Sequence, residues 1–239
     1  GFNLAFLAAF EAGDRIAVTA PGYPAYRNLA RALGIEIVEI EVNADTRYAL
    51  TPELLEKAHR EKPLDGVLVA SPANPSGTLM TPQALEALIR ASEDLGLTFI
   101  SDEIYHRLVY AGEAETALRF TRDAIILNSF SKYYCMTGWR VGWMVLPPQL
   151  VRAVERIAQS FYISAPSISQ MAAVAAFEAT DELEIIKEGY AANRRLLVDR
   201  LPKLGFEELL PVDGAFYVYA SVRRFSNDSA DFARRLLEE

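Results

Sequence analysis

Three short apolar runs in the chain lack the alternation that a half-exposed strand would show. They have the sequences GVLVA at residues 66–70, LTFI at 97–100 and AIIL at 124–127. A strand covered by helices on both faces of its sheet has no polar side, so these runs predict buried parallel strands. The run at 15–19 predicts another strand, and the alternating segment at 36–42 predicts a more exposed one.

Helical patterns separate these strands. The pairs Thr51-Pro52 and Thr81-Pro82 each provide an N-cap followed by a proline in the first turn of a helix. The repeated order of strand, helix and strand predicts βαβ units and an open, mostly parallel sheet with helices on both faces. The apolar run at 141–146 predicts one more strand, with an antiparallel direction as an option.

The second part of the chain is mainly helical. Predicted helices lie at 150–160, 168–179 and 181–201, a strand region follows at 205–220, and a last helix begins near 228. This last helix has no stop signal before the final residue, which we interpret as a cut chain.

Composition and charge limit the classes of function. Of the 239 residues, 51% are hydrophobic, which allows a large core. The net charge of −8 disfavours nucleic acid and anionic membrane as partners, because both select clustered Lys and Arg. The apolar start at 1–10 is about half as long as a membrane span and predicts a buried helix. The single cysteine, Cys135, and the absence of metal-ligand spacing predict a cytoplasmic protein without a metal site.

Polar residues follow the three buried runs, and they carry the candidate chemistry. Asn74, Asp102 and Lys132 come after the runs in order, about one βα unit apart. Ligands of open α/β sheets bind just outside the carboxyl ends of the strands, so an amide, a carboxylate and an amine are expected at one edge. Each also has an ordinary interpretation, as a turn residue, a helix cap and a solvated lysine respectively. Their joint placement favours a shared site.

This combination suits a cofactor that contains a pyridine ring and an aldehyde. The amine of a lysine forms a Schiff base with an aldehyde. A carboxylate that faces a pyridine nitrogen keeps the ring protonated, and such a ring accepts electrons. Ser129 and Arg140 flank Lys132 and offer a hydroxyl and a bidentate guanidinium to a phosphate. The chemistry permits pyridoxal phosphate without requiring it.

Five segments carry a resemblance to a known family. They are APGYPAY at 20–26, SPANPSGT at 71–78, SDEIY at 101–105, NSFSKYYCMTGWRVGW at 128–143 and DGAFYVY at 213–219. In this order they resemble the class I/II aminotransferases of pyridoxal-phosphate fold type I, the aspartate aminotransferase-like superfamily, over nearly the whole chain. The lysine segment is the most specific, with a serine three residues before Lys132 and an arginine eight after it.

The resemblance implies three catalytic residues. Lys132 would hold pyridoxal 5′-phosphate as a Schiff base and act as the acid and base of the proton transfer. Asp102 would pair with the ring nitrogen. Tyr105, together with Asn74, would hydrogen-bond the 3′ oxygen of the ring.

The resemblance also implies three further cofactor-binding residues. Ser129 and Arg140 would bind the phosphate. Tyr23 would stack on the ring, with plain core packing as its alternative.

For the whole protein, the resemblance implies an enzyme that transfers an amino group from an amino acid to a 2-oxo acid and works as a homodimer. It implies a three-layer α/β/α large domain at 1–180, then a linking helix and part of a smaller α+β domain at 181–239. The phosphate loop would precede residue 1, and the arginine for the substrate carboxylate would follow residue 239. Two alternatives stay open: a carbon–sulfur β-lyase of the same fold, and the sensor domain of certain transcription regulators.

Overall fold

The computed structural model describes residues 1–206 and 208–238, and within them six strands form one sheet in the order β2-β1-β3-β4-β5-β6. The strands are β1 (Arg15–Ala20), β2 (Glu36–Glu41), β3 (Gly66–Ala70), β4 (Thr98–Asp102), β5 (Ile125–Ser129) and β6 (Gly142–Val145). Strands β1 to β5 are parallel, and β6 is antiparallel to β5. The predicted strands up to residue 146 are therefore confirmed, including the antiparallel option.

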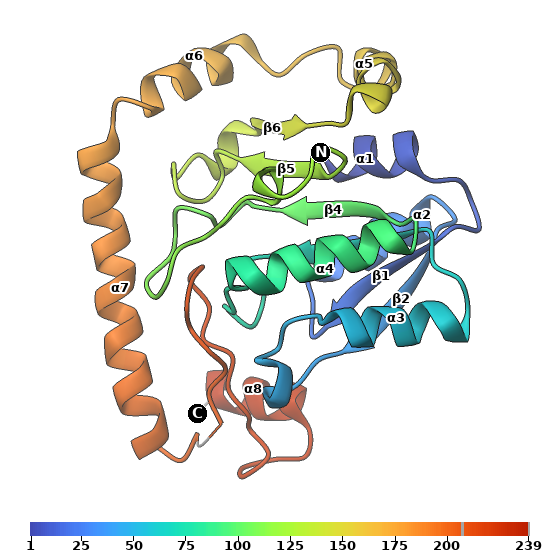
Figure 1. The fold of residues 1–239 in the computed structure, drawn as a ribbon. Coiled ribbons are helices and arrows are strands. Elements are labelled where there is room, and N and C mark those ends of the chain that lie inside the picture. The colour runs from blue at the N-terminus through green and yellow to red at the C-terminus, as the bar shows by residue number, and fades with distance from the viewer. Residues whose placement is uncertain (207, 239) are drawn as a thin grey trace.

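Helices cover both faces of the sheet (Figure 1). One face packs against α3 (Pro52–Glu61) and α4 (Pro82–Asp94). The other packs against α1 (Phe2–Ala9), α2 (Pro24–Ala32) and α5 (Pro148–Phe161). The apolar strands thus lie between two hydrophobic clusters, as their lack of alternation predicts, and the three-layer α/β/α architecture is confirmed.

The predicted helix caps are present in two of these helices. The Thr51 hydroxyl accepts a hydrogen bond from the backbone N–H of Leu54 at 3.4 Å, at the start of α3. The Thr81 hydroxyl accepts one from the N–H of Ala84 at 3.2 Å, at the start of α4. Each bond satisfies an N–H group that has no partner inside its own helix.

The chain then crosses to the carboxyl side of the sheet. The remaining elements are α6 (Ser167–Ala176), α7 (Thr180–Lys203), α8 (Ser229–Glu238) and the short 3-10 helices Ala44–Thr46, Ala117–Arg119 and Thr137–Trp139. In Figure 1 the arrowheads of β4 and β5 point toward the side along which α7 runs. Ala173 of α6 and Leu183 of α7 join a third cluster that contains Tyr105, so these helices help to enclose the strand ends. The predicted boundary at residue 180 stays a prediction.

The prediction of strand character at 205–220 is wrong for the residues that the structure describes there. They contain isolated bridges, between Val109 and Gly214 and between Leu209 and Ala220, instead of a strand. The segment pairs with loops: the N–H of Gly214 donates to the Gly77 carbonyl at 3.0 Å. A Cβ on Gly214 would lie 2.4 Å from Cγ of Pro72, so only glycine permits this approach.

The last predicted helix is confirmed as α8, and Glu239 lies outside the described residues. Among the described helices, none has the length and apolar character that crossing a membrane requires.

Candidate active site

The parallel sheet brings the predicted residues to its carboxyl edge. Asp102 is the last residue of β4 and stands between Ala70 of β3 and Leu127 of β5. Asn74 lies in the loop after β3, and Lys132 lies just beyond the end of β5. The three residues therefore follow three adjacent parallel strands, β3, β4 and β5, and lie at one edge of the sheet as predicted.

Asp102 is a buried carboxylate, 6% exposed. Its Oδ2 accepts a hydrogen bond from the Tyr26 hydroxyl at 2.5 Å, and its Oδ1 accepts one from the N–H of Ile104 at 3.3 Å. Burial raises the pKa of Asp102 to about 6, against the opposing effects of these two bonds and the charge of Lys132. A cationic or N–H partner bound next to Asp102 would therefore stabilise its charged form.

Tyr105 and Asn74 converge on one oxygen atom. The Tyr105 and Tyr217 hydroxyls are 2.6 Å apart, and Nδ2 of Asn74 donates to the same Tyr217 hydroxyl at 3.1 Å. Burial, followed by the bond to Tyr217, raises the pKa of Tyr105 above its ordinary value, so Tyr105 stays a neutral hydroxyl. The two side chains that the resemblance assigns to a shared ring oxygen are therefore aimed at a common point.

The side chain of Lys132 extends over the rings of Tyr105 and Phe216. Its Nζ lies 5.8 Å from the centre of the Tyr105 ring and 5.2 Å from that of Phe216. Asp102 ends β4 and Lys132 follows the end of β5, the adjacent parallel strand, so the carboxylate and the amine lie at the same edge of the sheet. A ring held between the amine of Lys132 and the carboxylate of Asp102 requires this common edge.

Ser129 and Arg140 lie at the end of the β5–β6 pair. Ser129 pairs with Gly142 in the ladder, two residues beyond Arg140. The Ser129 hydroxyl lies 2.8 Å from that of Ser131, and Nη1 of Arg140 donates to the Thr137 carbonyl at 2.9 Å. A Cβ on Gly1 would lie 2.5 Å from Cδ2 of Leu127 in β5, so the start of α1 lies beside the β5–β6 pair.

Anion-binding groups therefore gather at this corner. The N-terminus of a helix offers free N–H groups, the serine offers a hydroxyl and the guanidinium offers a forked pair of donors. They are the groups that a phosphate needs.

Tyr23 precedes α2 as its N-cap and is 41% exposed. The centres of the Tyr23 and Tyr26 rings are 5.3 Å apart, in an edge-to-face arrangement. Tyr23 also makes a minor electrostatic contribution that raises the pKa of Tyr105. This exposure argues against the alternative of plain core packing. The side chain borders the same region as Tyr105 and Asp102.

The sequence assigns no role to Tyr26 or Glu103, and it suggests for Tyr217 only a place at the substrate entrance. Tyr26 belongs to the APGYPAY segment and Tyr217 to the DGAFYVY segment, both of which carry the resemblance. Nothing in the spacing of these segments indicates that the two hydroxyls reach Asp102 and Asn74. Tyr26 and Asp102 are separated by 76 positions in the sequence, and Asn74 and Tyr217 by 143 positions. Only the folded chain brings each pair together.

Glu103 follows Asp102 and points to the opposite side of the sheet. Its Oε1 accepts hydrogen bonds from the hydroxyls of Ser101 at 3.2 Å and Thr116 at 3.0 Å, and from the N–H of Ala117 at 3.0 Å. Nδ1 of His106 lies 3.3 Å from its Oε2. Burial lowers the pKa of His106 to about 4, so this contact is no ion pair near neutral pH. Glu103 thus anchors the loop that carries Tyr105.

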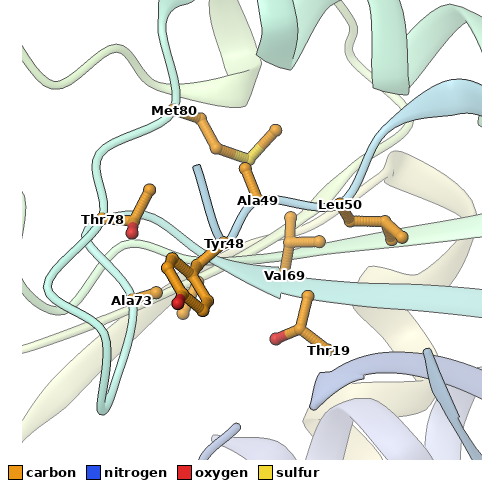
Figure 2. Close-up of a pocket in the computed structure, with 9 residues that line it drawn as sticks. Thr19, Tyr48, Ala49, Leu50, Val69, Ala73, Thr78 and Met80 are labelled. Carbon is orange, nitrogen blue, oxygen red and sulfur yellow. The ribbon is translucent and has the colours of Figure 1, made fainter. Parts of the chain in front are cut away.

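A small cavity lies beside the Asn74 loop (Figure 2). Its lining residues are Thr19, Tyr48, Ala49, Leu50, Val69, Ala70, Ala73, Thr78 and Met80. Its volume of about 10 Å³ is close to the minimum for one water molecule, which excludes a substrate. A larger groove of about 340 Å³ lies along α7, where Lys187 pairs with Glu184 and Arg195 with Glu188.

The donor set at the carboxyl edge fits pyridoxal phosphate. Asp102 suits the ring N–H, Tyr105 and Asn74 suit a ring oxygen, and Lys132 supplies the amine. Ser129 and Arg140 supply donors for the phosphate. All seven predicted site residues, Tyr23, Asn74, Asp102, Tyr105, Ser129, Lys132 and Arg140, border this edge, and their individual roles stay proposals.

Comparisons with known proteins agree with this fit. The family described as aminotransferase class I and II matches residues 2–239. A valine–pyruvate aminotransferase of Mycobacterium tuberculosis is 50% identical over 243 residues, covering 100% of this chain and 62% of the relative. A crystal structure of an aminotransferase from Mycobacterium tuberculosis has a TM-score of 0.96 at 50% identity and covers 100% of this chain and 62% of that one.

A more distant structure shares the same architecture. The aspartate aminotransferase from Thermus thermophilus with maleate has a TM-score of 0.93 at 30% identity, and the alignment covers 99% of this chain and 63% of that one. The chain therefore spans a little over three fifths of the length of the relatives it matches.

Stability measurements on Asp102→Asn test the burial of the carboxylate in the cofactor-free protein. The native pKa of about 6 lies above the ordinary 3.8, so the native state binds the proton more tightly than the unfolded state does. The resulting stabilisation is present below pH 3.8 and is lost as the pH rises through about 6. Between about pH 3 and about pH 8, we expect urea denaturation to show wild type losing on the order of 3 kcal/mol relative to Asp102→Asn. A difference that stays constant over this range would contradict a desolvated carboxylate.

Proposed function

Because this chain belongs to the aminotransferase class I and II family, we propose that the whole protein is a pyridoxal-phosphate-dependent aminotransferase that moves an amino group from an amino acid to a 2-oxo acid. The observation that carries the proposal is the placement of a buried carboxylate, Asp102, at the end of β4, beside the end of β5 from which Lys132 follows. The aminotransferase names of its relatives support the same reaction. When bound, pyridoxal phosphate supplies an aldehyde and a ring that accepts electrons.

Lys132 and Asp102 carry the central roles in this proposal. Lys132 would hold the cofactor through Nζ and would yield that position to the amino group of the substrate. Its freed amine would then take the proton from the substrate Cα and deliver it to the carbon that carried the aldehyde of the cofactor. Asp102 accepts the hydrogen bond of the ring nitrogen and keeps that nitrogen protonated, which withdraws electrons from Cα.

The remaining residues bind and orient. Tyr105 and Asn74 donate hydrogen bonds to the ring oxygen, in place of the Tyr217 hydroxyl on which they now converge. Ser129 and Arg140 bind the phosphate, and this anchor fixes how far the ring reaches toward Lys132.

We propose Tyr23 as the side chain that covers one face of the ring. Its partial exposure leaves the aromatic face available.

Substrate choice follows most directly from the relative at 50% identity, a valine–pyruvate aminotransferase. We propose valine as an amino donor and pyruvate as an acceptor. The β-lyase and the sensor domain have no observation in their favour, because the lysine segment and its surroundings follow the aminotransferase pattern throughout. The single cysteine favours a cytoplasmic location for the protein, which we retain as a proposal.

A homodimer is supported by an apolar surface on the segment from 161 to 186, which we call the α6 surface. Its exposed apolar side chains are Phe161, Tyr162, Ile163, Ile168, Met171, Val174, Phe177, Ile185 and Ile186. Large exposed apolar surfaces mark interaction sites in soluble proteins. Met171 and Val174 are 72% and 70% exposed and lie one helical turn apart, at the centre of α6. A second copy of the protein is the occupant that we propose.

Lys132→Ala tests the attachment of the cofactor. Borohydride reduction of the full-length wild-type protein should attach pyridoxal phosphate covalently to the peptide that contains Lys132, because only a Schiff base is reduced to a stable amine. The variant should lose this adduct by mass spectrometry and lose more than about 10³-fold in turnover. Lys187→Ala, on α7, is the matched control and should keep the adduct. An adduct at the same site in Lys132→Ala would contradict the assignment.

A panel of single amino acids tests the reaction and the substrate class. In the absence of an acceptor, an aminotransferase converts its bound aldehyde to the amine form, so the visible absorption should shift once per site. We expect valine to give this shift and pyruvate to reverse it. Release of pyruvate and ammonia from cystathionine without an added oxo acid would instead identify the β-lyase. A shift with other amino acids but none with valine would reject only the substrate proposal.

Met171→Asp tests the α6 surface as a dimer interface. Sedimentation of the full-length wild-type protein should give a dimer, and the variant should dissociate at concentrations at least about 100-fold higher, because a charge is buried without a partner. Leu118→Asp, in the 3-10 helix Ala117–Arg119, places the same charge on another exposed apolar residue and should leave the dimer intact. A wild-type monomer would show that another part of the full-length protein covers this surface.

A further inference from the structure

Tyr26 reaches the candidate site from a helix that belongs to the core. It lies in α2, which covers one face of the sheet, and it is only 5% exposed. Its ring lies 5.0 Å from that of Phe2 and 5.3 Å from that of Tyr23. From this position its hydroxyl donates a hydrogen bond of 2.5 Å to Oδ2 of Asp102. The rest of the side chain packs with the apolar residues between α1, α2 and the sheet.

The hydrogen bond from Tyr26 helps to fix the orientation of the Asp102 carboxylate. Oδ2 of Asp102 is held by Tyr26, and Oδ1 accepts the N–H of Ile104 at 3.3 Å. Two donors on different oxygens, from different elements, define the plane of the carboxylate. A carboxylate oxygen accepts more than one hydrogen bond, so the group can still receive a further N–H.

We propose that Tyr26 is a positioning residue, which keeps Asp102 ionised and turned toward the ring nitrogen of pyridoxal phosphate. This inference rests on the proposed function. It gives a role in the reaction to a residue whose ring is part of the hydrophobic core.

The chemistry of the pair favours the donor role of Tyr26. Burial, followed by the negative charge of Asp102, raises the pKa of Tyr26 well above 10, so the phenol keeps its proton and donates it. The hydrogen bond from Tyr26 is the leading influence that lowers the pKa of Asp102 against its burial. A phenylalanine at position 26 would keep the ring and remove this stabilisation of the charged form.

Other titratable groups surround the pair. Lys132 lowers the pKa of Asp102 from the loop after β5, and Asp102 raises the pKa of Glu103 on the far side of β4. Tyr105 and Tyr23 act on Tyr26 from the loop after β4 and from the start of α2. Of the side chains named here, only Tyr26 donates a hydrogen bond to Asp102 in the described residues.

The test compares two ligands in cofactor-free full-length protein. One is pyridoxal phosphate, and the other is an analogue in which a C–H group replaces the ring nitrogen. Tyr26→Phe should weaken binding of pyridoxal phosphate by about 10-fold, the value of a hydrogen bond to a charged group. It should leave the affinity for the analogue unchanged, because that ring offers Asp102 no N–H. In the presence of Asp102→Asn, Tyr26→Phe should weaken binding of pyridoxal phosphate by less than about two-fold.

Tyr133→Phe provides the matched control. The Tyr133 hydroxyl donates to a carboxylate oxygen of Glu184 at 2.6 Å, and its ring is also buried, so the chemical change is the same at a different carboxylate. Both affinities should be unchanged in this control.

Each other outcome rejects a defined part of the argument. Equal losses for the two ligands in Tyr26→Phe would show that Tyr26 acts through packing alone, and no loss for either would show that it has no role. Both results would overturn this inference and leave the proposed function intact. A wild-type protein that binds neither ligand would overturn the proposed function, and the inference with it.

Discussion

The burial of one carboxylate, that of Asp102, is the constraint on which the site depends. A charged carboxyl group at the end of a central strand loses most of its hydration, and this raises its pKa to about 6. The protein opposes the loss with the Tyr26 hydroxyl, the Ile104 N–H and the charge of Lys132. The balance leaves a carboxylate that gains most from a protonated ring nitrogen, which is the partner that the proposed reaction requires.

The fold creates this constraint through the order of its strands. Asp102 ends β4, which is flanked on both sides by parallel strands and on both faces by helices, so the residue is only 6% exposed. The loops that leave β3 and β5 at the same edge carry Asn74 and Lys132. The chain then returns from α7, and Gly214 docks against Pro72 and Gly77, which brings Tyr217 to Asn74. Close backbone contact between distant segments thus sets the positions of the Phe216 and Tyr217 rings.

How far the sequence predicts this arrangement depends on the range of the interactions. The strands, their parallel order and the caps at Thr51 and Thr81 depend on local patterns, and all are confirmed. The strand predicted at 205–220 is wrong because the backbone N–H groups at its centre, from 213 to 215, bond to the carbonyls of Gly77 and Leu108 far away in sequence, although its residue types suit a strand. The partnership of Tyr26 with Asp102 was missed for the same reason. A tyrosine three residues after Tyr23 indicates a helix face, but it does not indicate which strand end that face meets.

Asp102 and Glu103 show how a strand end separates two neighbouring carboxylates. Successive residues of a strand point to opposite faces, so one carboxylate meets Tyr26 and the other meets the turn at Thr116 and Ala117. Burial raises the pKa of both. Oε1 of Glu103 accepts three hydrogen bonds from protein donors, so Glu103 serves to hold the loop. Asp102 accepts one hydrogen bond on each oxygen and keeps capacity for a further donor at the edge of the sheet that also carries Lys132, and this location assigns the chemistry to Asp102.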